Sequence, residues 1–467
     1  MSGRVALLAS ALAITAGAQT AGAQTLTVLQ ETGPREHRLN VVFVAEGYTA
    51  GQTALFETRA RQALGLLLQE PPYDRYGDLF NAYAVFVASN EAGSDHPSRN
   101  EYRDTAFDTY YDCADIERLI CVGDGGALLE TLVTTIPTYD IVIVLVNDPQ
   151  YGGSGGTWSV SSAHEAAPAI AVHEVGHSFA GLADEYGGTQ SGFTSVNTSV
   201  TARRGEVPWS FWVHPSTPLP TPDTGAARDS VGAFLGAAYS DTGAYRPQHE
   251  CGMRSLNVPF CAVCHEHHIG AIYRQLSPLG VAEPAEESVE VADAAVTFRV
   301  APLAPPETRA VEWLLNGTPL PGGAETLALS GADLPAGTST LELRVTDGTP
   351  AVRDPALLPL LRDARTWTLT NTATPSEGDP DGAWLGVPFP NPSAGTVRVP
   401  VRLDVPGPLR VTVLDALGRT VAVLADEPQL TGTVTLTWHG AEHARGVYLV
   451  RLETDRTVAT QRVTIAR

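Results

Sequence analysis

Two histidines and a glutamate with the spacing His-Glu-x-x-His are the residues of this sequence best suited to chemistry. On a helix, residues four apart lie on one face, so His173 and His177 can offer two imidazole nitrogens to one zinc ion. Glu174 lies beside that face and can hold a water molecule against the metal as a general base. Asp184 and Glu185 follow, and either carboxylate could be the third ligand. Three protein ligands and a water molecule form a catalytic zinc site, whereas structural zinc usually has four protein ligands.

The residues around this motif predict a buried helix that turns back at its end. Residues 169–172 before the motif, and Phe179 and Leu182 after it, are apolar. Gly181 can end the helix and bring a downstream carboxylate to the metal. The alternative is a surface helix that carries two histidines by chance, but buried histidine and glutamate side chains need partners. We therefore favour a metal site.

A sheet with covering helices is expected to position the motif, which predicts a mixed α+β domain. Three runs have the composition of strands: residues 39–45, 80–88 and 140–147. Two runs have helical spacing of apolar residues: 53–68 and 125–136. The polar residues 90–115 form a long loop that could bind Ca²⁺, although solvated surface is the favoured interpretation and nothing in the spacing requires the ion.

A glycine-rich segment at 151–162 follows the last of these strands. Such a segment could bind phosphate, but the Walker pattern is absent because the sequence contains no lysine. We interpret it instead as a hairpin that returns as an edge strand. An unpaired edge beside the metal could hold an extended peptide by strand addition, with substrate lying along residues 155–161.

Met253 is the only methionine after the initiator. Because methionine packs adaptably, this side chain could simply fill the core. It could also form the Met-turn that lies beneath the metal of metzincin peptidases. Its rarity and its position after the expected zinc helix favour the Met-turn.

Three segments of the chain together resemble the igalysin family of secreted bacterial metallopeptidases, which are of metzincin type. They are His173-Glu-Val-Gly-His-Ser-Phe-Ala-Gly-Leu-Ala-Asp-Glu-Tyr186, Tyr151-Gly-Gly-Ser-Gly-Gly156, and Cys251-Gly-Met-Arg-Ser255 with Phe260-Cys-Ala-Val-Cys264. The resemblance covers residues 37–275. The founding activity of the family is cleavage of immunoglobulin A. The resemblance implies proteolysis here, but it does not imply the antibody substrate.

The resemblance also implies roles for particular residues. Zinc is expected on His173, His177 and Asp184, with Glu174 as catalytic base and Met253 in the Met-turn. The implied fold over residues 24–278 is a metzincin-like catalytic domain, a mixed twisted sheet with helices.

One departure from the general metzincin pattern concerns the third ligand. That ligand usually lies six residues after the second histidine, where this chain has Ala183, which cannot bind a metal. The ligand is therefore expected at Asp184 or Glu185, and we favour Asp184.

Two small all-β sandwich domains are expected after the catalytic domain. Residues 279–370 alternate short apolar runs with turn residues, which predicts an immunoglobulin-like β-sandwich, and 371–386 read as a polar linker. Residues 387–467, with Phe389-Pro-Asn-Pro392 and Asp415-Ala-Leu-Gly-Arg419, resemble the C-terminal sorting domain of the Bacteroidota type IX secretion system. That resemblance implies the type IX machinery as a partner, and release from the cell or anchoring on its surface.

The start of the chain and its charge point to export as well. Residues 1–23 predict a secretory signal peptide, with Arg4 as the basic region, an apolar run from Val5 to Thr15 and the cleavage site Ala21-Gly-Ala23, with Ala16-Gly-Ala18 as the alternative site. No later run is long enough to predict a transmembrane segment. The formal net charge of −22 argues against nucleic acid as a partner, because phosphate would be repelled.

The five cysteines of an exported chain are most simply two disulfides and one free thiol. Cys113 and Cys121 would close a short loop, and Cys251 could pair with Cys261 or Cys264. The Cys-x-x-Cys pair at 261 and 264, followed by histidines at 265, 267 and 268, also has metal-ligand spacing. A separate zinc site there is the less favoured interpretation, because no second Cys-x-x-Cys pair exists.

The predicted function is that of a zinc endopeptidase acting on extracellular proteins through one catalytic Zn²⁺. Glu174 would pass a proton from the attacking water to the leaving amine. Tyr186 and Tyr245 are candidate hydrogen-bond donors to the oxyanion, chosen by proximity in sequence alone. The alternative is a surface adhesin or binding protein with a vestigial metal site. Glu174 argues against the adhesin, because a purely structural metal site has no need of that carboxylate.

Overall fold

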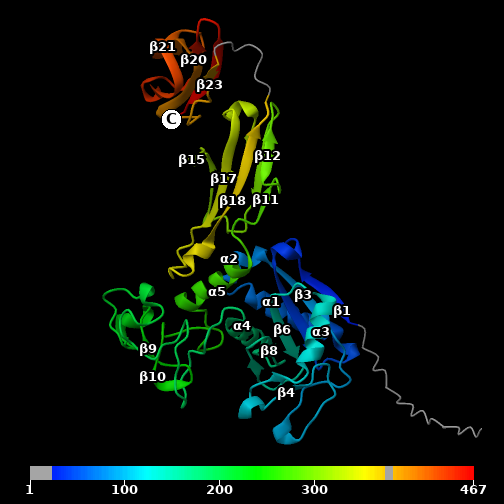
Figure 1. Cartoon of the computed structure of the whole chain (residues 1–467). Helices are drawn as coiled ribbons and strands as arrows, with labels where there is room; N and C mark the ends of the chain where they lie inside the picture. Colours follow the sequence, from blue (N-terminus) through cyan, green and yellow to red (C-terminus); the bar gives the residue numbers. More distant parts are fainter. Residues whose placement is uncertain (1–23, 374–381, 467) are drawn as a thin grey trace, which may run out of the picture. The chain divides into compact units, whose positions relative to one another are not determined.

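The computed structural model describes residues 24–373 and 382–466 of the chain (Figure 1). The expected signal peptide at 1–23, and residues 374–381 of the expected linker, lie outside the described residues. The chain divides into two compact units, Met1–Ile272 and Tyr273–Arg467. The first unit contains a sheet with helices and the second consists mainly of strands, so the predicted α+β class is confirmed.

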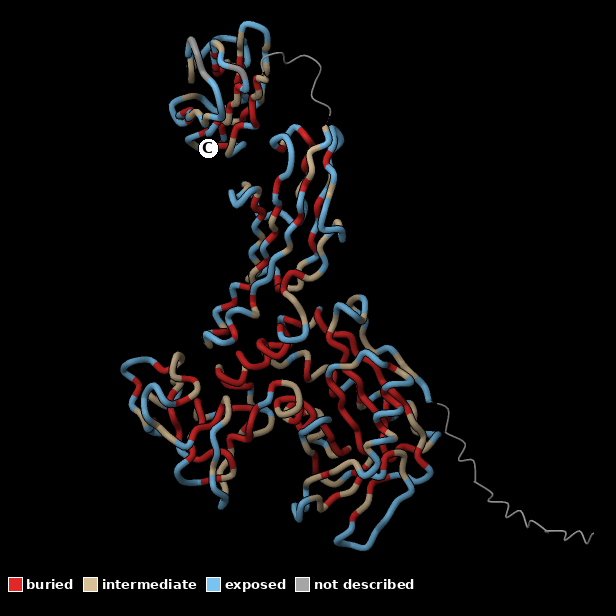
Figure 2. Tube along the Cα trace, in the orientation of Figure 1, coloured by how far each residue is buried: buried red, intermediate tan, exposed pale blue. Residues whose placement is uncertain are grey.

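A six-stranded sheet with the order β1-β3-β2-β6-β8-β7 forms the centre of the first unit. Its strands are β1 (Thr25–Gln30), β2 (Leu39–Glu46), β3 (Phe80–Phe86), β6 (Ile141–Val146), β7 (Gly153–Ser154) and β8 (Ser159–Ser161). The four inner strands are parallel, while β1 and β7 run antiparallel to their neighbours. Strands β2, β3 and β6 are buried along their whole length, as apolar runs covered on both faces should be (Figure 2).

Helices pack on both faces of this sheet. Helices α1 (Thr53–Leu67) and α3 (Gly125–Thr135) cover opposite faces, and the unit also contains α2 (Tyr73–Tyr76), α4 (Ala167–Ser178) and the greater part of α5 (Ala262–Gln275). Leu128 of α3 packs in one core with Val85 of β3. Phe56 of α1 contacts Phe86, whose side chain points to the opposite face because successive residues of a strand alternate. Helix α4 packs beside α1 and contacts β6, β7 and β8. The His-Glu-x-x-His motif is therefore held against the β7 side of the sheet.

The glycine-rich segment differs from its prediction in one respect. The edge strand is β7 alone, whereas β8 is an interior strand that pairs parallel with β6 and is fully buried. The expectation that residues 155–161 run along an open edge is wrong for Ser159–Ser161. The outer side of β7 is also engaged, because the Gly153 amide donates a hydrogen bond of 3.1 Å to the Arg118 carbonyl. A protein chain that follows a strand so closely takes up hydrogen-bonding groups that a substrate would otherwise use.

The remaining strands of the first unit form two small ribbons. Strands β4 (Thr109–Tyr110) and β5 (Cys121–Val122) pair beside a disulfide between Cys113 and Cys121. Strands β9 (Phe234–Ala237) and β10 (Ser240–Arg246) form a hairpin within the otherwise irregular stretch after the motif.

The second unit contains two separate hydrophobic cores. The first lies between a three-stranded sheet and a five-stranded sheet, around Trp313 and Trp367. Its strands are β11 (Val281–Glu283), β12 (Ser288–Val291), β13 (Val296–Ala301), β14 (Arg309–Leu315), β15 (Thr318–Pro319), β16 (Thr326–Leu329), β17 (Gly337–Asp347) and β18 (Arg362–Asn371).

The second core belongs to the C-terminal strands and includes Trp438 and Tyr448. These strands are β19 (Ala383–Leu385), β20 (Thr396–Leu414), β21 (Thr420–His439), β22 (Gly446–Glu453) and β23 (Val458–Ile465). Among the described residues of the whole chain, no helix combines the length and the apolar character needed to cross a bilayer.

Candidate metal centre

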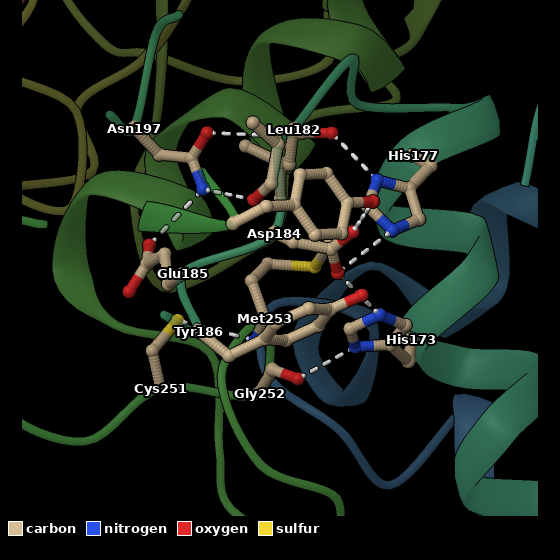
Figure 3. Close-up of polar contacts among 12 residues, drawn as sticks. His173, His177, Leu182, Asp184, Glu185, Tyr186, Asn197, Cys251, Gly252 and Met253 are labelled. Atoms are coloured by element: carbon tan, nitrogen blue, oxygen red, sulfur yellow. Dashed lines mark hydrogen bonds and ion pairs between the residues drawn. The ribbon is translucent and has the colours of Figure 1, made fainter. Parts of the chain in front are cut away.

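His173 and His177 lie one turn apart on α4 and face the same carboxylate (Figure 3). Their Nε2 atoms lie 3.1 Å and 3.3 Å from Oδ1 of Asp184. The ligand atoms of the three residues all lie within 4.8 Å of one another. The structure thus brings together the three residues that the sequence nominated for the metal, and it places Asp184 rather than Glu185 beside the histidines.

The end of α4 explains how Asp184 reaches this position. Gly181 adopts a positive φ of 69°, which favours glycine because a side chain would be strained there. The amide of Gly181 donates to the carbonyl of His177, and that of Leu182 donates to the carbonyl of Gly176. These two bonds close the helix with a left-handed residue and reverse the chain, as the sequence predicted for Gly181.

Each histidine is oriented by a backbone carbonyl. Nδ1 of His173 donates to the Gly252 carbonyl at 2.9 Å, and Nδ1 of His177 donates to the Leu182 carbonyl at 2.7 Å. A carbonyl oxygen can only accept, so in both contacts the proton resides on Nδ1. The Nε2 atoms are left to bind a metal, which is the arrangement that second ligand shells of metal sites commonly impose.

The carboxylates and imidazoles of the centre have the charges that a bound cation requires. Burial alone would raise the pKa of Asp184, yet hydrogen bonds from the two imidazoles hold that pKa well below its usual range. Burial alone would lower the pKa of His177, but its contacts with Asp184 and Glu174 raise it to about 9. The two buried carboxylates therefore require positive charge between them. A divalent cation could supply that charge in place of the imidazole protons, so the donor set fits zinc.

Glu174 lies beneath the glycine-rich segment and is 8% exposed. A Cβ atom on Gly155 would lie 2.9 Å from Oε2 of Glu174 and 2.6 Å from Cβ of His177, and one on Gly153 would lie 3.2 Å from Oε1. The glycines are thus needed for close approach of the backbone to the site. Burial raises the pKa of Glu174, against the lowering effect of the nearby histidines.

Met253 is fully buried on the inner side of α4. A Cβ atom on Gly176 would lie 2.5 Å from Sδ of Met253, so the thioether rests against the turn of helix between the two histidines. The Met253 carbonyl also accepts the amide of Glu185 at 2.8 Å. Met253 therefore packs against the helix that carries both histidines.

The two nominated tyrosines occupy different places. The Tyr186 hydroxyl accepts a hydrogen bond of 3.1 Å from Nη2 of Arg118, and its ring packs edge-on against Tyr239. Tyr245 pairs with Leu235 in the β9–β10 hairpin and lines a separate hollow, so the structure does not bring it to the histidines.

Tyr239 is a residue of the centre that sequence reasoning missed. Its hydroxyl donates to Oδ2 of Asp184, on the carboxylate oxygen that does not face the histidines. Burial and the adjacent Asp184 raise the pKa of this phenol. Tyr239 lies in the turn between β9 and β10 with a positive φ of 61°, and no motif in the sequence marks it.

A pocket of about 250 Å³ opens beside His173 and Glu174. Its other lining residues combine two arginines with aromatic and apolar side chains: Arg118, Tyr151, Ile170, Tyr186, Arg254, Ser255 and Leu256. The pocket gives a reacting group access to both the predicted ligand His173 and the predicted base Glu174.

The predicted disulfide pattern is half right. Cys113 and Cys121 form a disulfide, but Cys251, Cys261 and Cys264 are all free and buried. The expectation that Cys251 pairs with one of the other two is therefore wrong in this structure. The Sγ atoms of Cys251 and Cys264 lie 3.6 Å apart, well beyond the ~2.05 Å of a disulfide bond.

Two family descriptions match the sequence. The one described as IgA Peptidase M64 matches residues 27–227 and 223–272, which together contain every residue of the centre. The one described as the secretion system C-terminal sorting domain matches residues 388–466. That domain marks the chain for secretion and cell-surface attachment through the type IX system. A comparison with curated proteins found no match.

Similarities to solved structures are weak. SGBP-B of the Bacteroides ovatus mixed-linkage glucan utilization locus is 15% identical over 38% of this chain and 42% of its own, with a TM-score of 0.16. Dimeric latent PorU of Porphyromonas gingivalis is 13% identical over 39% of this chain and 19% of its own, with a TM-score of 0.17. The chain thus spans less than half the length of either protein, and TM-scores this low carry no argument.

Proposed function

We propose that this chain, which belongs to the IgA peptidase M64 family, is a zinc-dependent endopeptidase that hydrolyses peptide bonds of extracellular proteins. The observation that carries the proposal is the convergence of two Nε2 atoms on one oxygen of Asp184, with Glu174 beside them. Three protein ligands with a carboxylate base at hand form a catalytic site of metzincin type rather than a structural one.

His173, His177 and Asp184 would hold the ion. When bound, zinc polarises a substrate carbonyl and lowers the pKa of its water toward ~7. Oδ2 of Asp184 stays engaged by the Tyr239 hydroxyl, and both Nδ1 atoms stay engaged by carbonyls. The protein thus fixes the direction of every ligand before the ion arrives, which reduces the reorganisation that binding would otherwise require.

Glu174 would act as the general base and then as the general acid. Its pKa is raised chiefly by burial, which brings a carboxylate closer to the range in which it exchanges protons at neutral pH. It would accept a proton from the attacking water and deliver it to the leaving amine. The glycine backbone of residues 153–155 covers its other side, so the carboxylate is held in place and shielded from bulk solvent.

The developing negative charge on the substrate oxygen needs a donor. Tyr186 lines the pocket with His173 and Glu174, and its hydroxyl lies against the Arg118 guanidinium. The phenol and the guanidinium together provide hydrogen-bond donors at the mouth of the site. Tyr239 is a positioning residue, because its hydroxyl is engaged with Asp184.

Replacing Glu174 tests this function most directly. We expect Glu174→Ala to lose hydrolysis of a general protein substrate while the zinc content stays at the level of the unaltered protein. Glu165→Ala, which removes an exposed carboxylate just before α4, is the matched control and should retain activity. Turnover at the wild-type rate in Glu174→Ala would contradict the assignment of Glu174 as the general base. A zinc-loaded protein that cleaves nothing, with or without a chelator, would favour the adhesin alternative.

A further inference from the structure

We propose that Glu185, Cys251, Cys261 and Cys264 form a second metal centre, which holds a structural Zn²⁺ behind the predicted catalytic site. One ligand atom from each residue lies within 4.8 Å of all the others, and all four residues are buried. Three thiolates and one carboxylate make four protein ligands, the number typical of a structural zinc site. This centre is independent of whether the first one hydrolyses peptides.

The distances fit a tetrahedral ion. With Zn–S bonds of ~2.3 Å, tetrahedral geometry puts two sulfur ligands ~3.8 Å apart and a sulfur and an oxygen ligand ~3.5 Å apart. Sγ of Cys251 lies 3.6 Å from Sγ of Cys264. Oε1 of Glu185 lies 3.0 Å from Sγ of Cys264 and 3.8 Å from Sγ of Cys261. The sulfur–sulfur separation is slightly shorter than the ideal value, and the two sulfur–oxygen separations lie on either side of theirs.

A buried polar atom lacks a partner here. Glu185 is 0% exposed, and its Oε2 atom has no hydrogen-bond partner among the described residues. Its other oxygen is held at 3.1 Å by the side-chain amide of Asn197. A buried carboxylate aimed into three sulfur atoms is costly unless a cation compensates it. A bound ion would satisfy both the carboxylate and the thiolates.

Backbone amides surround the sulfur atoms as they do in zinc–thiolate sites. The amides of Met253 and Cys261 donate to Sγ of Cys251 at 3.4 Å and 3.3 Å, and the amide of Cys264 donates to Sγ of Cys261 at 3.5 Å. Such bonds stabilise negative charge on sulfur. Cys261 immediately precedes α5, and the N-terminal end of a helix further favours thiolate.

The two centres lie on opposite sides of one short segment (Figure 3). Asp184 faces the histidines while its neighbour Glu185 faces the cysteines. In the turn at 251–253, Cys251 faces the cysteine cluster, the Gly252 carbonyl holds His173, and Met253 packs under α4. An ion at the second centre would therefore fix both segments that support the first.

The ligand atoms of the cluster indicate a thiophilic ion such as Zn²⁺ rather than a hard one. Four anionic ligands around Zn²⁺ leave excess negative charge, and the buried guanidinium of Arg246 interacts electrostatically with Glu185 and Cys251. Sulfur ligands select zinc or another thiophilic ion over Ca²⁺ or Mg²⁺, which prefer oxygen.

Counting metal ions in the full-length protein tests the proposal. Purified protein is equilibrated with zinc, dialysed, and analysed for metal per chain. We expect two zinc ions in the unaltered protein and one in His177→Ala. Cys264→Ser should lose an ion, while Cys113→Ser with Cys121→Ser, which removes two cysteines outside the cluster, should keep both. One ion in the unaltered protein and none in His177→Ala would overturn the proposal.

A cysteine variant could lose its ion simply because it fails to fold. Spectroscopy of His177→Ala avoids this problem, because that variant keeps all the cysteines. Loaded with Co²⁺, this protein should show near-ultraviolet absorption from sulfur-to-cobalt charge transfer, because its remaining ion has thiolate ligands. Absence of that absorption, or an intact mass that reveals a second disulfide, would contradict the proposal. Neither readout involves peptide hydrolysis, so a protein with two ions and no peptidase activity would retain the second centre and lose only the proposed function.

Discussion

The carboxylates of Asp184 and Glu185 point in opposite directions from adjacent positions in the chain. Oδ1 of Asp184 lies 3.1 Å from Nε2 of His173, whereas Oε1 of Glu185 lies 3.0 Å from Sγ of Cys264. Adjacent residues of an extended segment project to opposite sides, so only one of the two can reach a given centre. Asn197 fixes the segment by bonding both the amide and the carbonyl of Ala183.

The opposite orientations of the Asp184 and Glu185 carboxylates predict different outcomes when each residue is replaced. Asp184→Ala should remove the predicted third ligand of the catalytic ion, and we expect peptidase activity and zinc affinity to fall at least ~100-fold, beyond the range seen for outer-shell residues. Glu185→Gln keeps the shape of its side chain and leaves the histidine centre intact, so it should lower zinc content without abolishing hydrolysis. Zinc titration with a chromophoric chelator, alongside a peptide cleavage assay, measures both. Asp223→Ala, at an exposed site, is the control. Equal effects of the first two substitutions on activity would contradict the assignment.

The tyrosines offer a second test, which separates positioning from catalysis. Tyr239→Phe removes the hydroxyl that bonds Asp184, so we expect zinc affinity to fall ~10- to 100-fold, as for other partners of metal ligands. Tyr186→Phe removes a donor at the pocket and should lower kcat by ~100-fold with little change in zinc affinity or KM. Tyr245→Phe should leave all three quantities unchanged. If Tyr245→Phe lowers kcat as much as Tyr186→Phe does, the prediction that Tyr245 takes no part in the reaction is wrong.

The sequence predicted the parts of the fold that depend on local pattern. The strands β2, β3 and β6 were predictable because a continuous apolar run is stable as a strand only when both of its faces are buried. The common orientation of His173 and His177 was predictable because residues four apart share one face of a helix. Gly181 was predictable as the end of the helix because glycine tolerates a positive φ.

Features that depend on long-range contacts were not predictable. Tyr239 reaches Asp184 across 55 positions of sequence from a hairpin turn that no pattern marks. The order of β7 and β8 in the sheet follows from pairing partners, not from their short sequences. The partners of Cys251 could not be chosen either, because Glu185 enters the cluster from 66 positions upstream while the neighbouring histidines point elsewhere.

The metal-free protein should lose stability as the pH rises above neutrality. The folded pKa of His177 is about 9, above its unfolded value of ~6.5, so its contribution to stability is fully present below ~6.5 and is lost as the pH rises through about 9. The contribution of Asp184, whose folded pKa is lowered, persists above its unfolded pKa and is lost only in acid. Urea unfolding of chelator-treated protein from pH 6 to pH 9.5 checks this expectation.

The variant Asp184→Asn and a zinc titration test whether His177, rather than another titrating group, causes the loss of stability. Asp184→Asn should flatten the dependence on pH in this range, because the partner that raises the pKa of His177 is then neutral. Zinc affinity of the unaltered protein should rise over the same range, because binding must displace the imidazole protons. A chelated protein that gains stability between pH 7 and pH 9 would refute the charge arrangement.

Gly155 and Gly156 form a matched pair that tests the close approach over Glu174. A Cβ atom at Gly155 would lie 2.6 Å from Cβ of His177 and 2.9 Å from Oε2 of Glu174, whereas one at Gly156 would meet nothing within 4 Å. We expect Gly155→Ala to displace the glutamate or the histidine, lowering the free energy of unfolding by ~1–3 kcal/mol and kcat by at least ~10-fold. Gly156→Ala should match the unaltered protein in both. Because the two substitutions add the same methyl group to adjacent residues, similar kinetics would show that the backbone does not press on Glu174.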